Sequence, residues 1–153
     1  MFLWRISNHH ALDGRGGLLA SARWHTRGRP IVYLATSPAG ALVEVLVNLE
    51  LDPAHLPRTY QMLKAEAPQD LEVARIDPAS LPQDWRQDQI ASRSRGDEWL
   101  ASAPSALLEV PSALLPETSN ILLNPRHRDA SRIAVLWHEA YPYDRRLFRI
   151  KSK

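Results

Sequence analysis

Short apolar runs recur along this chain and indicate a protein built mainly from short strands. Each run is rich in aliphatic or aromatic residues and ends near Pro, Gly, Asp, Asn or Ser, which is typical of strands. The predicted strands are residues 2–6, 31–35, 60–65, 71–76, 106–110, 121–123, 133–137 and 146–150. We expect the first to be an edge strand, and a proline-containing turn to join 60–65 to 71–76.

Two segments have the spacing of helices instead. Ser37 and Pro38 form a plausible N-cap and first-turn proline, and a helix over residues 39–49 follows. Its apolar side carries Leu42, Val43, Leu46, Val47 and Leu49. Residues 85–101 have helical spacing at Trp85, Ile90, Trp99 and Leu100, although Gly96 weakens this helix.

The arrangement of these segments predicts a single α+β domain over residues 1–153. It should have a mixed β core of several short strands and two or three helices, with the glycine cluster at 13–17 forming a loop. We find no internal repeat, heptad or low-complexity tract, and the prolines are too scattered to mark a linker.

Composition narrows the class of protein. An apolar fraction of 44% suits a globular domain, and the absence of cysteine excludes disulfides and thiolate metal sites. The first residues are too short and too early-charged for a signal peptide, and no apolar run approaches the roughly 18 residues of a membrane span. We therefore expect a cytoplasmic protein with no membrane association.

The charge is small but unevenly placed. The net charge is +2, whereas residues 126–153 hold eight Arg and Lys against three Asp and Glu, a local balance of +5. Such a segment can bind nucleic acid or an acidic protein, or simply form a solvated surface. A non-enzymatic nucleic-acid-binding module is thus the competing class of function, although the chain lacks a recognition-helix motif.

Several common sites are excluded by spacing. The glycines at 14, 16 and 17 do not have the spacing of a dinucleotide-binding fingerprint, and no P-loop is present. His138-Glu139 begins like a zinc-binding helix, but the position four after His138 is Pro142. We expect no metal.

One stretch combines a cation, an aromatic ring and a carboxylate. Arg23 lies in a predicted turn, Tyr33 in the following strand and Glu44 in the helix after it. A site that cleaves a charged nucleotide needs these three residue types. The structural alternatives are a solvated Glu44, a core Tyr33 and an Arg23 whose stem covers apolar surface.

Three sequence blocks in the same order resemble the RES domain family. The blocks are Trp4-Arg5-Ile6, then Arg23-Trp24-His25 to Tyr33 and Glu44, then Val110-Pro111-Ser112 to Asn124-Pro125-Arg126-His127. The resemblance covers residues 4–138. The chain departs from the family pattern at His25, where many members have Asn, and in the Leu-Ala-Ser-Ala segment before Arg23.

The resemblance implies a bacterial type II toxin that acts on NAD⁺, with a fold similar to the ADP-ribosyltransferase toxins. Some RES proteins degrade NAD⁺ with water or phosphate as the acceptor. At least one branch transfers ADP-ribose to a protein, phosphoribosyl pyrophosphate synthetase. The implied partner is an Xre-type antitoxin, with DNA contacted only through it and a homodimer possible within the complex.

The residue chemistry agrees with NAD⁺ cleavage. Nicotinamide leaves as a neutral molecule, so the difficulty is a cationic ribosyl transition state, which the carboxylate of Glu44 can stabilise. Arg23, with Arg5 as a second candidate, suits the pyrophosphate because its planar fork pairs with anionic oxygens. Tyr33 can place its ring against the nicotinamide.

Three further polar residues complete the candidate set. Ser112 can hydrogen-bond Glu44 or the nicotinamide ribose, although a serine after proline is often just a turn residue. His25 and Asn124 are further NAD⁺-binding candidates without assigned roles, to which the resemblance adds little. We expect Arg23, Tyr33, Glu44 and Ser112 to converge on one cleft.

Overall fold

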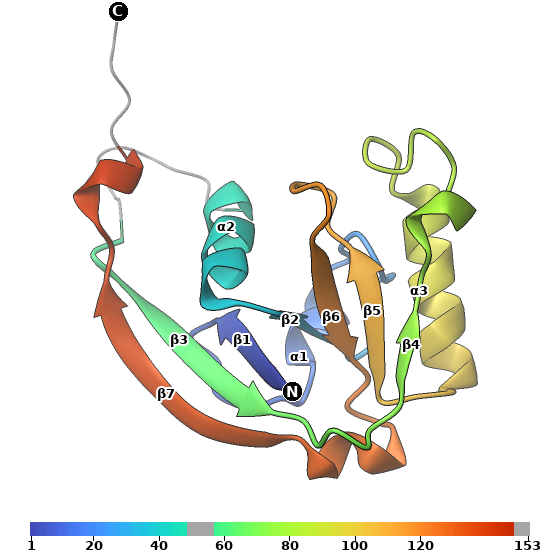
Figure 1. Cartoon of the computed structure of the whole chain (residues 1–153), viewed down its shortest axis with the longest axis horizontal. Helices are drawn as coiled ribbons and strands as arrows, with labels where there is room; N and C mark the ends of the chain where they lie inside the picture. The colour runs from blue at the N-terminus through green and yellow to red at the C-terminus, as the bar shows by residue number, and fades with distance from the viewer. Residues whose placement is uncertain (49–56, 149–153) are drawn as a thin grey trace, which may run out of the picture.

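Seven strands form one mixed sheet in the computed structural model, which describes residues 1–48 and 57–148 (Figure 1). The strands are β1 (Phe2–Ile6), β2 (Val32–Ala35), β3 (Thr59–Glu66), β4 (Val73–Arg75), β5 (Leu107–Pro111), β6 (Ser119–Leu123) and β7 (Ala134–Pro142). The helices are α1 (Arg15–Leu19), α2 (Pro38–Asn48) and α3 (Ile90–Ser102). Short 3₁₀ turns are η2 (Pro78–Ser80), η3 (Arg128–Arg132) and η4 (Arg145–Phe148).

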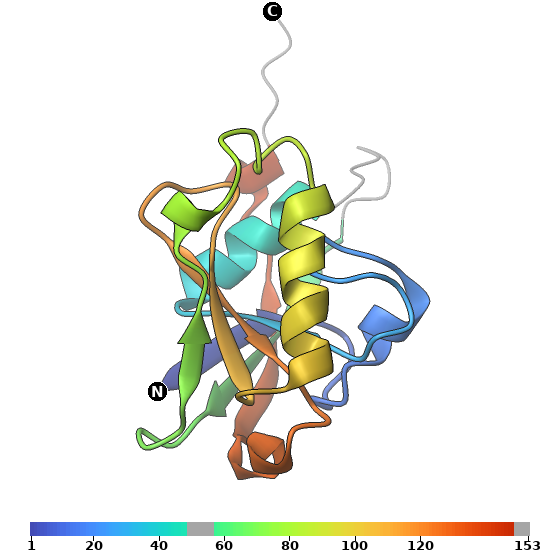
Figure 2. The ribbon, with the colours of Figure 1, turned by 90° about the vertical axis from the view of Figure 1, so that its right-hand side faces the viewer.

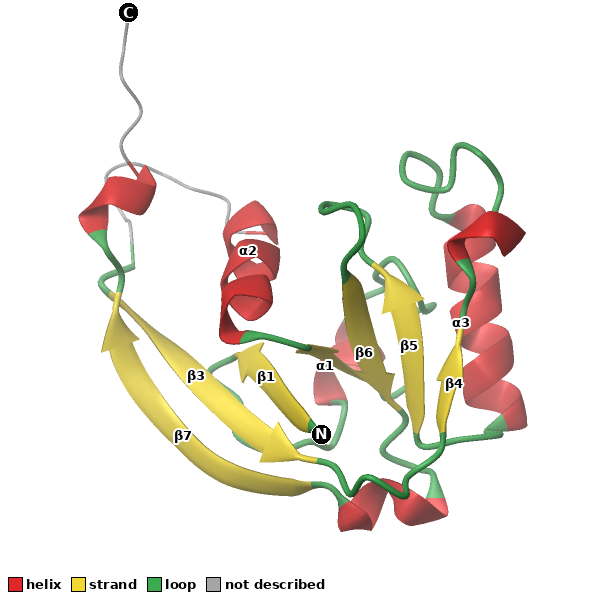
Figure 3. Cartoon of the chain, in the orientation of Figure 1, coloured by secondary structure: helices red, strands yellow, loops and turns green. Residues whose placement is uncertain are grey.

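The sheet has two parts that meet at a weak junction. Its strand order is β4-β5-β6-β2-β1-β3-β7, and only the β4–β5 pair is parallel. β1 pairs with β2 only through Trp4 and Ala35, whereas β3 and β7 pair along their whole length. The two parts therefore diverge from this junction, and α2 lies between them (Figure 3).

Apolar side chains fill both faces of the β5–β6 part. Leu107 and Leu123 belong to the larger core cluster on one face, and Leu108 and Leu122 to a second cluster on the other. Alternate residues of a strand point to opposite faces, so these strands are buried on both. The second cluster includes Trp99 of α3, which runs beside β4 and β5 (Figure 2).

The predicted α+β domain with a mixed β core is confirmed, but one expectation about strand order was wrong. β1 is not an edge strand, because β2 and β3 flank it and Leu3 is fully buried. A turn that includes Pro68 joins β3 to β4 as expected, and the two strands do not pair, since β4 lies parallel to β5 at the far edge of the sheet.

Three local predictions also need correction. Residues 15–17 of the expected loop belong to α1, and Gly14 precedes that helix with a φ of 73°, a left-handed conformation that suits glycine. α3 begins at Ile90 rather than at 85, because the Asp88 side chain accepts a hydrogen bond from the Ile90 N–H and ends the preceding turn. Residues 145–148 form a 3₁₀ turn in place of a strand.

The predicted helix over 39–49 corresponds to α2, and Leu49, like residues 149 and 150 of the last predicted strand, lies outside the described residues. No helix in the described part of the chain is long and apolar enough to cross a lipid bilayer.

Candidate active site

A cavity of about 570 Å³ opens at the junction of the two sheet parts. Its walls come from β1, β2, α2, β6, the loop before β2, the start of α3 and the turn after β5. The lining residues include Trp4, Arg5, Arg23, Trp24, Tyr33, Ala41, Glu44, Val45, Gln89, Leu114 and Asn120. The volume is within the range of small-molecule sites, about 300–1,000 Å³. Three of the four residues expected to converge, Arg23, Tyr33 and Glu44, line this one cavity.

Glu44 enters the cavity from α2 and is held by a residue that sequence reasoning missed. The Ser37 Oγ accepts a hydrogen bond from the Gly40 N–H and so caps the start of α2. The Asn120 Nδ2 of β6 donates to the Glu44 Oε1 at 2.6 Å. A hydrogen bond to an ionised carboxylate is stronger than one between neutral groups, so Asn120 orients the Glu44 side chain.

Tyr33 lies on β2 and its hydroxyl is fully engaged within the protein. It accepts a hydrogen bond from the Trp24 N–H at 3.1 Å and lies 2.9 Å from the His25 Nδ1. Burial raises the pKa of the Tyr33 hydroxyl, so it stays protonated at neutral pH. The part of Tyr33 available to a ligand is therefore its ring rather than an acidic proton.

The Arg23 guanidinium bonds to the protein backbone and also lines the cavity. Its Nη1 donates to the Trp85 carbonyl and its Nη2 to the Arg86 carbonyl, each at 3.0 Å. A guanidinium has five N–H donors, so these two bonds leave donors for an anion. Burial lowers the Arg23 pKa and the nearby Glu44 charge opposes that shift, and arginine remains cationic in proteins.

Arg5 supplies a second cation from β1. Its Nη1 is buried and has no hydrogen-bond partner among residues 1–48 and 57–148. Burial lowers the Arg5 pKa, partly offset by the charge of Asp13. A buried donor without a partner is costly, and a bound phosphate oxygen would supply the missing acceptor. The donor set of Arg5 and Arg23 thus fits a pyrophosphate.

Ser112 does not line this cavity. The Ser112 side chain is 3% exposed, and its Oγ accepts hydrogen bonds from the Leu114 and Leu115 N–H groups at 3.2 Å. It borders a smaller hollow of about 280 Å³ instead. The expected contact with Glu44 is therefore absent from the described structure, because Ser112 closes the turn after β5 and Asn120 takes its place.

His25 and Asn124 also lie outside the cavity lining. Asn124 is 3% exposed and its Oδ1 accepts from the Arg126 N–H, so its side chain shapes a turn. His25 is 2% exposed and lies behind Tyr33, where no ligand in the cavity can reach it directly. The sequence block identified these positions but not the direction of their side chains.

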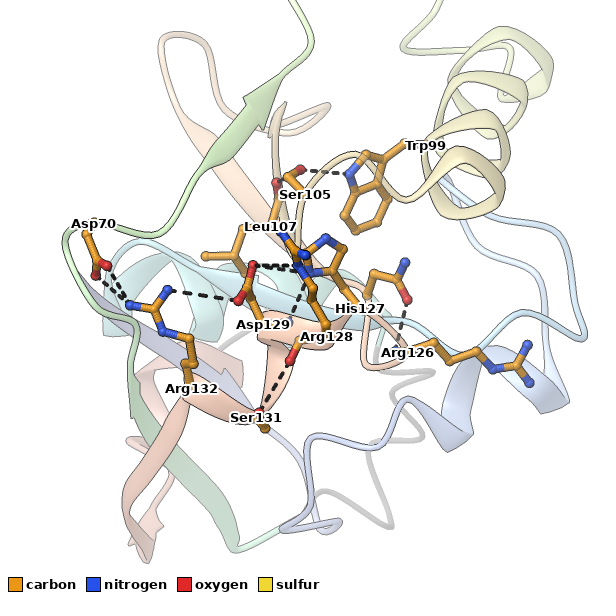
Figure 4. A network of polar contacts seen from close by, with 11 residues as sticks. Asp70, Trp99, Ser105, Leu107, Arg126, His127, Arg128, Asp129, Ser131 and Arg132 are labelled. Carbon is orange, nitrogen blue, oxygen red and sulfur yellow. Dashed lines mark hydrogen bonds and ion pairs between the residues drawn. The ribbon is translucent and has the colours of Figure 1, made fainter.

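Arginines of the basic C-terminal segment form ion pairs away from the cavity. Arg132 lies between Asp70 and Asp129 (Figure 4). Its Nη2 is 2.6 Å from the Asp70 Oδ2. Arg146 pairs with Asp144 at 2.6 Å. Asp129 and Asp144 are already counted in the balance of +5 for residues 126–153, so only Asp70 lowers this local charge, from +5 to +4.

The fold and cavity together define a single-domain α+β protein whose main cleft carries two arginines, a tyrosine ring and a carboxylate. A family model described as the RES domain matches residues 2–145, and the chain belongs to this family. The resemblance predicted from the three sequence blocks is confirmed.

Relatives extend this match over nearly the whole chain. Toxin Res of Pseudomonas putida is 45% identical over 148 residues, covering 97% of this chain and 100% of that protein. The Prs ADP-ribosylating toxin of a Sphingobium species is 36% identical over 158 residues, covering 95% and 96%. A chain of the M. tuberculosis MbcT–MbcA toxin–antitoxin complex superposes with a TM-score of 0.72 at 16% identity, covering 96% of this chain and 86% of that one, and so shares the fold.

Proposed function

We propose that this chain is a cytoplasmic toxin that cleaves the nicotinamide–ribose bond of NAD⁺. The observation that carries the proposal is the meeting of Arg5, Arg23, Tyr33 and Glu44 around one cavity of nucleotide-binding size. The relative named as a Prs ADP-ribosylating toxin supports chemistry on an ADP-ribose donor. No metal enters the proposed chemistry.

In the proposed reaction, the bond between the nicotinamide nitrogen and the ribose C1′ breaks, and both electrons stay with nicotinamide. Nicotinamide thereby becomes neutral and positive charge develops on the ribose. The Glu44 carboxylate, fixed by Asn120, stabilises that charge electrostatically. An acceptor oxygen or nitrogen then bonds to C1′ and loses its proton, so the products are nicotinamide and ADP-ribose joined to the acceptor.

The other cavity residues bind and orient the substrate. Arg5 and Arg23 hold the pyrophosphate, and the Tyr33 ring packs against the nicotinamide, which limits the substrate to a reactive pose. Ser112 and His25 act on this geometry from outside the cavity, Ser112 through the turn that carries Leu114 and His25 through its contact with Tyr33.

Product analysis tests the proposal and identifies the acceptor. The purified chain is incubated with NAD⁺, alone, with inorganic phosphate, or with phosphoribosyl pyrophosphate synthetase, and the products are weighed by mass spectrometry. We expect nicotinamide release, with ADP-ribose on the synthetase, as the name of the Sphingobium relative suggests. Free ADP-ribose or ADP-ribose phosphate would identify water or phosphate as acceptor, and intact NAD⁺ in all three mixtures would exclude the activity.

Arg23→Lys should weaken NAD⁺ binding roughly 10- to 100-fold, the equivalent of one or more hydrogen bonds to a charged group. Lysine keeps the positive charge but loses the planar fork, and so cannot hold both the 85–86 carbonyls and a phosphate. Calorimetric titration measures the affinity. Arg128→Lys is the matched control, because the Arg128 side chain is 90% exposed and lies outside the cavity. Unchanged affinity in Arg23→Lys would exclude the pyrophosphate role.

An Xre-type antitoxin should occlude the same cavity. A chain that consumes NAD⁺ must be blocked in its own host, and an acidic or carboxylate-ended segment can replace the pyrophosphate beside Arg5 and Arg23. Co-expression of the antitoxin should restore growth, and the free chain should bind NAD⁺ more tightly than the complex does. Equal affinities would indicate inhibition from outside the cavity.

A further inference from the structure

A buried histidine lies directly behind Tyr33, and both of its ring nitrogens have partners. The His25 Nδ1 lies 2.9 Å from the Tyr33 hydroxyl, and the His25 Nε2 lies 2.9 Å from the Ala20 carbonyl oxygen. A carbonyl only accepts, so Nε2 must carry a proton. In the neutral ring Nδ1 is then an acceptor, and the Tyr33 hydroxyl donates to it.

The surroundings of His25 favour this neutral tautomer. α1 packs against the ring so closely that a Cβ on Gly17 would lie 3.1 Å from the His25 Nε2. The charged residues that act on the ring are Arg93 and Asp97 of α3, and their effects on its pKa oppose each other. Both are engaged elsewhere: Arg93 donates to the Ala22 carbonyl, and Asp97 accepts from the Thr26 N–H.

The hydrogen bonds fix Tyr33 at both ends of its side chain. Its backbone is held by the pairing of β2 with β6, opposite Leu122. Its hydroxyl accepts from the Trp24 N–H and donates to His25, so the side chain cannot swing away from this position without breaking these bonds. The ring therefore presents a fixed surface to the cavity that it lines.

We infer that His25 is a positioning residue for the Tyr33 ring and thereby for the nicotinamide end of the substrate. This inference rests on the proposed function, in which the Tyr33 ring packs against nicotinamide. His25 itself contacts neither substrate nor reacting atoms, because it is 2% exposed and absent from the cavity wall. It acts only through the Tyr33 hydroxyl.

The inference predicts a specific loss of activity in acid. Protonation turns Nδ1 into a donor, and the Tyr33 hydroxyl then loses its acceptor. Burial holds the His25 pKa below its ordinary value of 6.5. The Tyr33 hydroxyl therefore donates to Nδ1 fully above about pH 6.5, and this donation is lost as the pH falls through the lowered pKa, which leaves the hydroxyl proton without an acceptor.

Four variants test the inference through nicotinamide release against pH and NAD⁺ concentration. His25→Leu should lower kcat/KM about tenfold, the size of one lost hydrogen bond. Tyr33→Phe removes the hydroxyl's bonds to both Trp24 and His25, so it should lower kcat/KM at least as far. The double variant should fall no further than Tyr33→Phe, because the bond that His25→Leu removes is already lost there. His25→Asn keeps an acceptor oxygen that cannot be protonated there, so it should stay within about twofold at neutral pH and lose the acid decline.

A spectroscopic measurement keeps the test independent of variant folding. In the unmutated chain, the ¹⁵N chemical shifts of the His25 ring should show a proton on Nε2 and none on Nδ1. A proton on Nδ1, losses that multiply in the double variant, or an unchanged acid decline in His25→Asn would each overturn the inference. Absence of nicotinamide release from the unmutated chain would instead exclude the proposed function. That result would be known before any variant is made.

Discussion

Glu44→Gln should lower the rate of NAD⁺ cleavage at least ~100-fold, as expected when a principal electrostatic stabiliser of the transition state is lost. Glutamine has nearly the shape of glutamate, and its side-chain oxygen can still accept the hydrogen bond from the Asn120 Nδ2. The substitution therefore removes the negative charge and keeps the anchor. Nicotinamide release at saturating NAD⁺ measures the effect.

Two further variants separate charge from position. Glu98→Gln removes the same charge from an exposed site on α3 away from the cavity, and should leave the rate unchanged. Asn120→Ala leaves the Glu44 charge in place without its hydrogen bond, so it should cost less than Glu44→Gln. A Glu44→Gln protein that cleaves NAD⁺ at the parent rate would rule out the electrostatic role.

The partner of Glu44 shows why the site was only partly predictable. Arg23, Tyr33 and Glu44 lie within one stretch of sequence, and a turn, strand and helix bring them to one cavity. Asn120 is 76 residues from Glu44, and the two meet only because β6 pairs with β2. Ser112 lies in the matching sequence block, but its side chain closes a turn and does not enter the cavity. The sequence block does not specify where that side chain points.

Strand positions were predictable for a physical reason, whereas strand order was not. Each strand can be recognised from a short run of apolar residues in the local sequence. Leu107 and Leu108 are an example, and they face opposite core clusters. The central place of β1 depends on its pairing with β3, whose residues lie 56 to 64 positions further along the chain. Such long-range pairing is decided by the whole sheet and not by local sequence. An isolated run at the N-terminus therefore resembled an edge strand.

The apolar spacing that predicted a helix over 85–101 marked only part of its buried face. Trp99 is buried as expected, whereas Ile90 is 75% exposed. The buried residues of α3 are Ser92, Gly96 and Trp99, so most of its contact face is small rather than apolar. Small residues allow the backbone of α3 to approach the segment that carries Arg23. A search for hydrophobic spacing cannot predict this close contact, because the residues that make it are not apolar.

Gly96→Ala should destabilise the fold by about 2 kcal/mol or more, at the upper part of the range for overpacking. A Cβ at Gly96 would lie 1.8 Å from the Trp24 carbonyl oxygen and 2.8 Å from its carbon, so a backbone must move. The intrinsic gain from alanine in a helix, about 1 kcal/mol, is too small to offset that clash. The Ser92 Oγ donates to the Arg23 carbonyl one turn earlier, so the same movement displaces Arg23.

Urea unfolding of Gly96→Ala beside Gly16→Ala measures this effect with a matched control. Gly16 lies in α1, and a methyl group added there would meet no other atom within 4 Å, so alanine at this position should be neutral or slightly stabilising. We also expect the folded fraction of Gly96→Ala to bind NAD⁺ more weakly, because Arg23 moves with the Trp24 backbone. Equal unfolding midpoints for the two variants would show that α3 and the Trp24 backbone are further apart in solution. The contact at Gly96 would then not help to position Arg23 at the cavity.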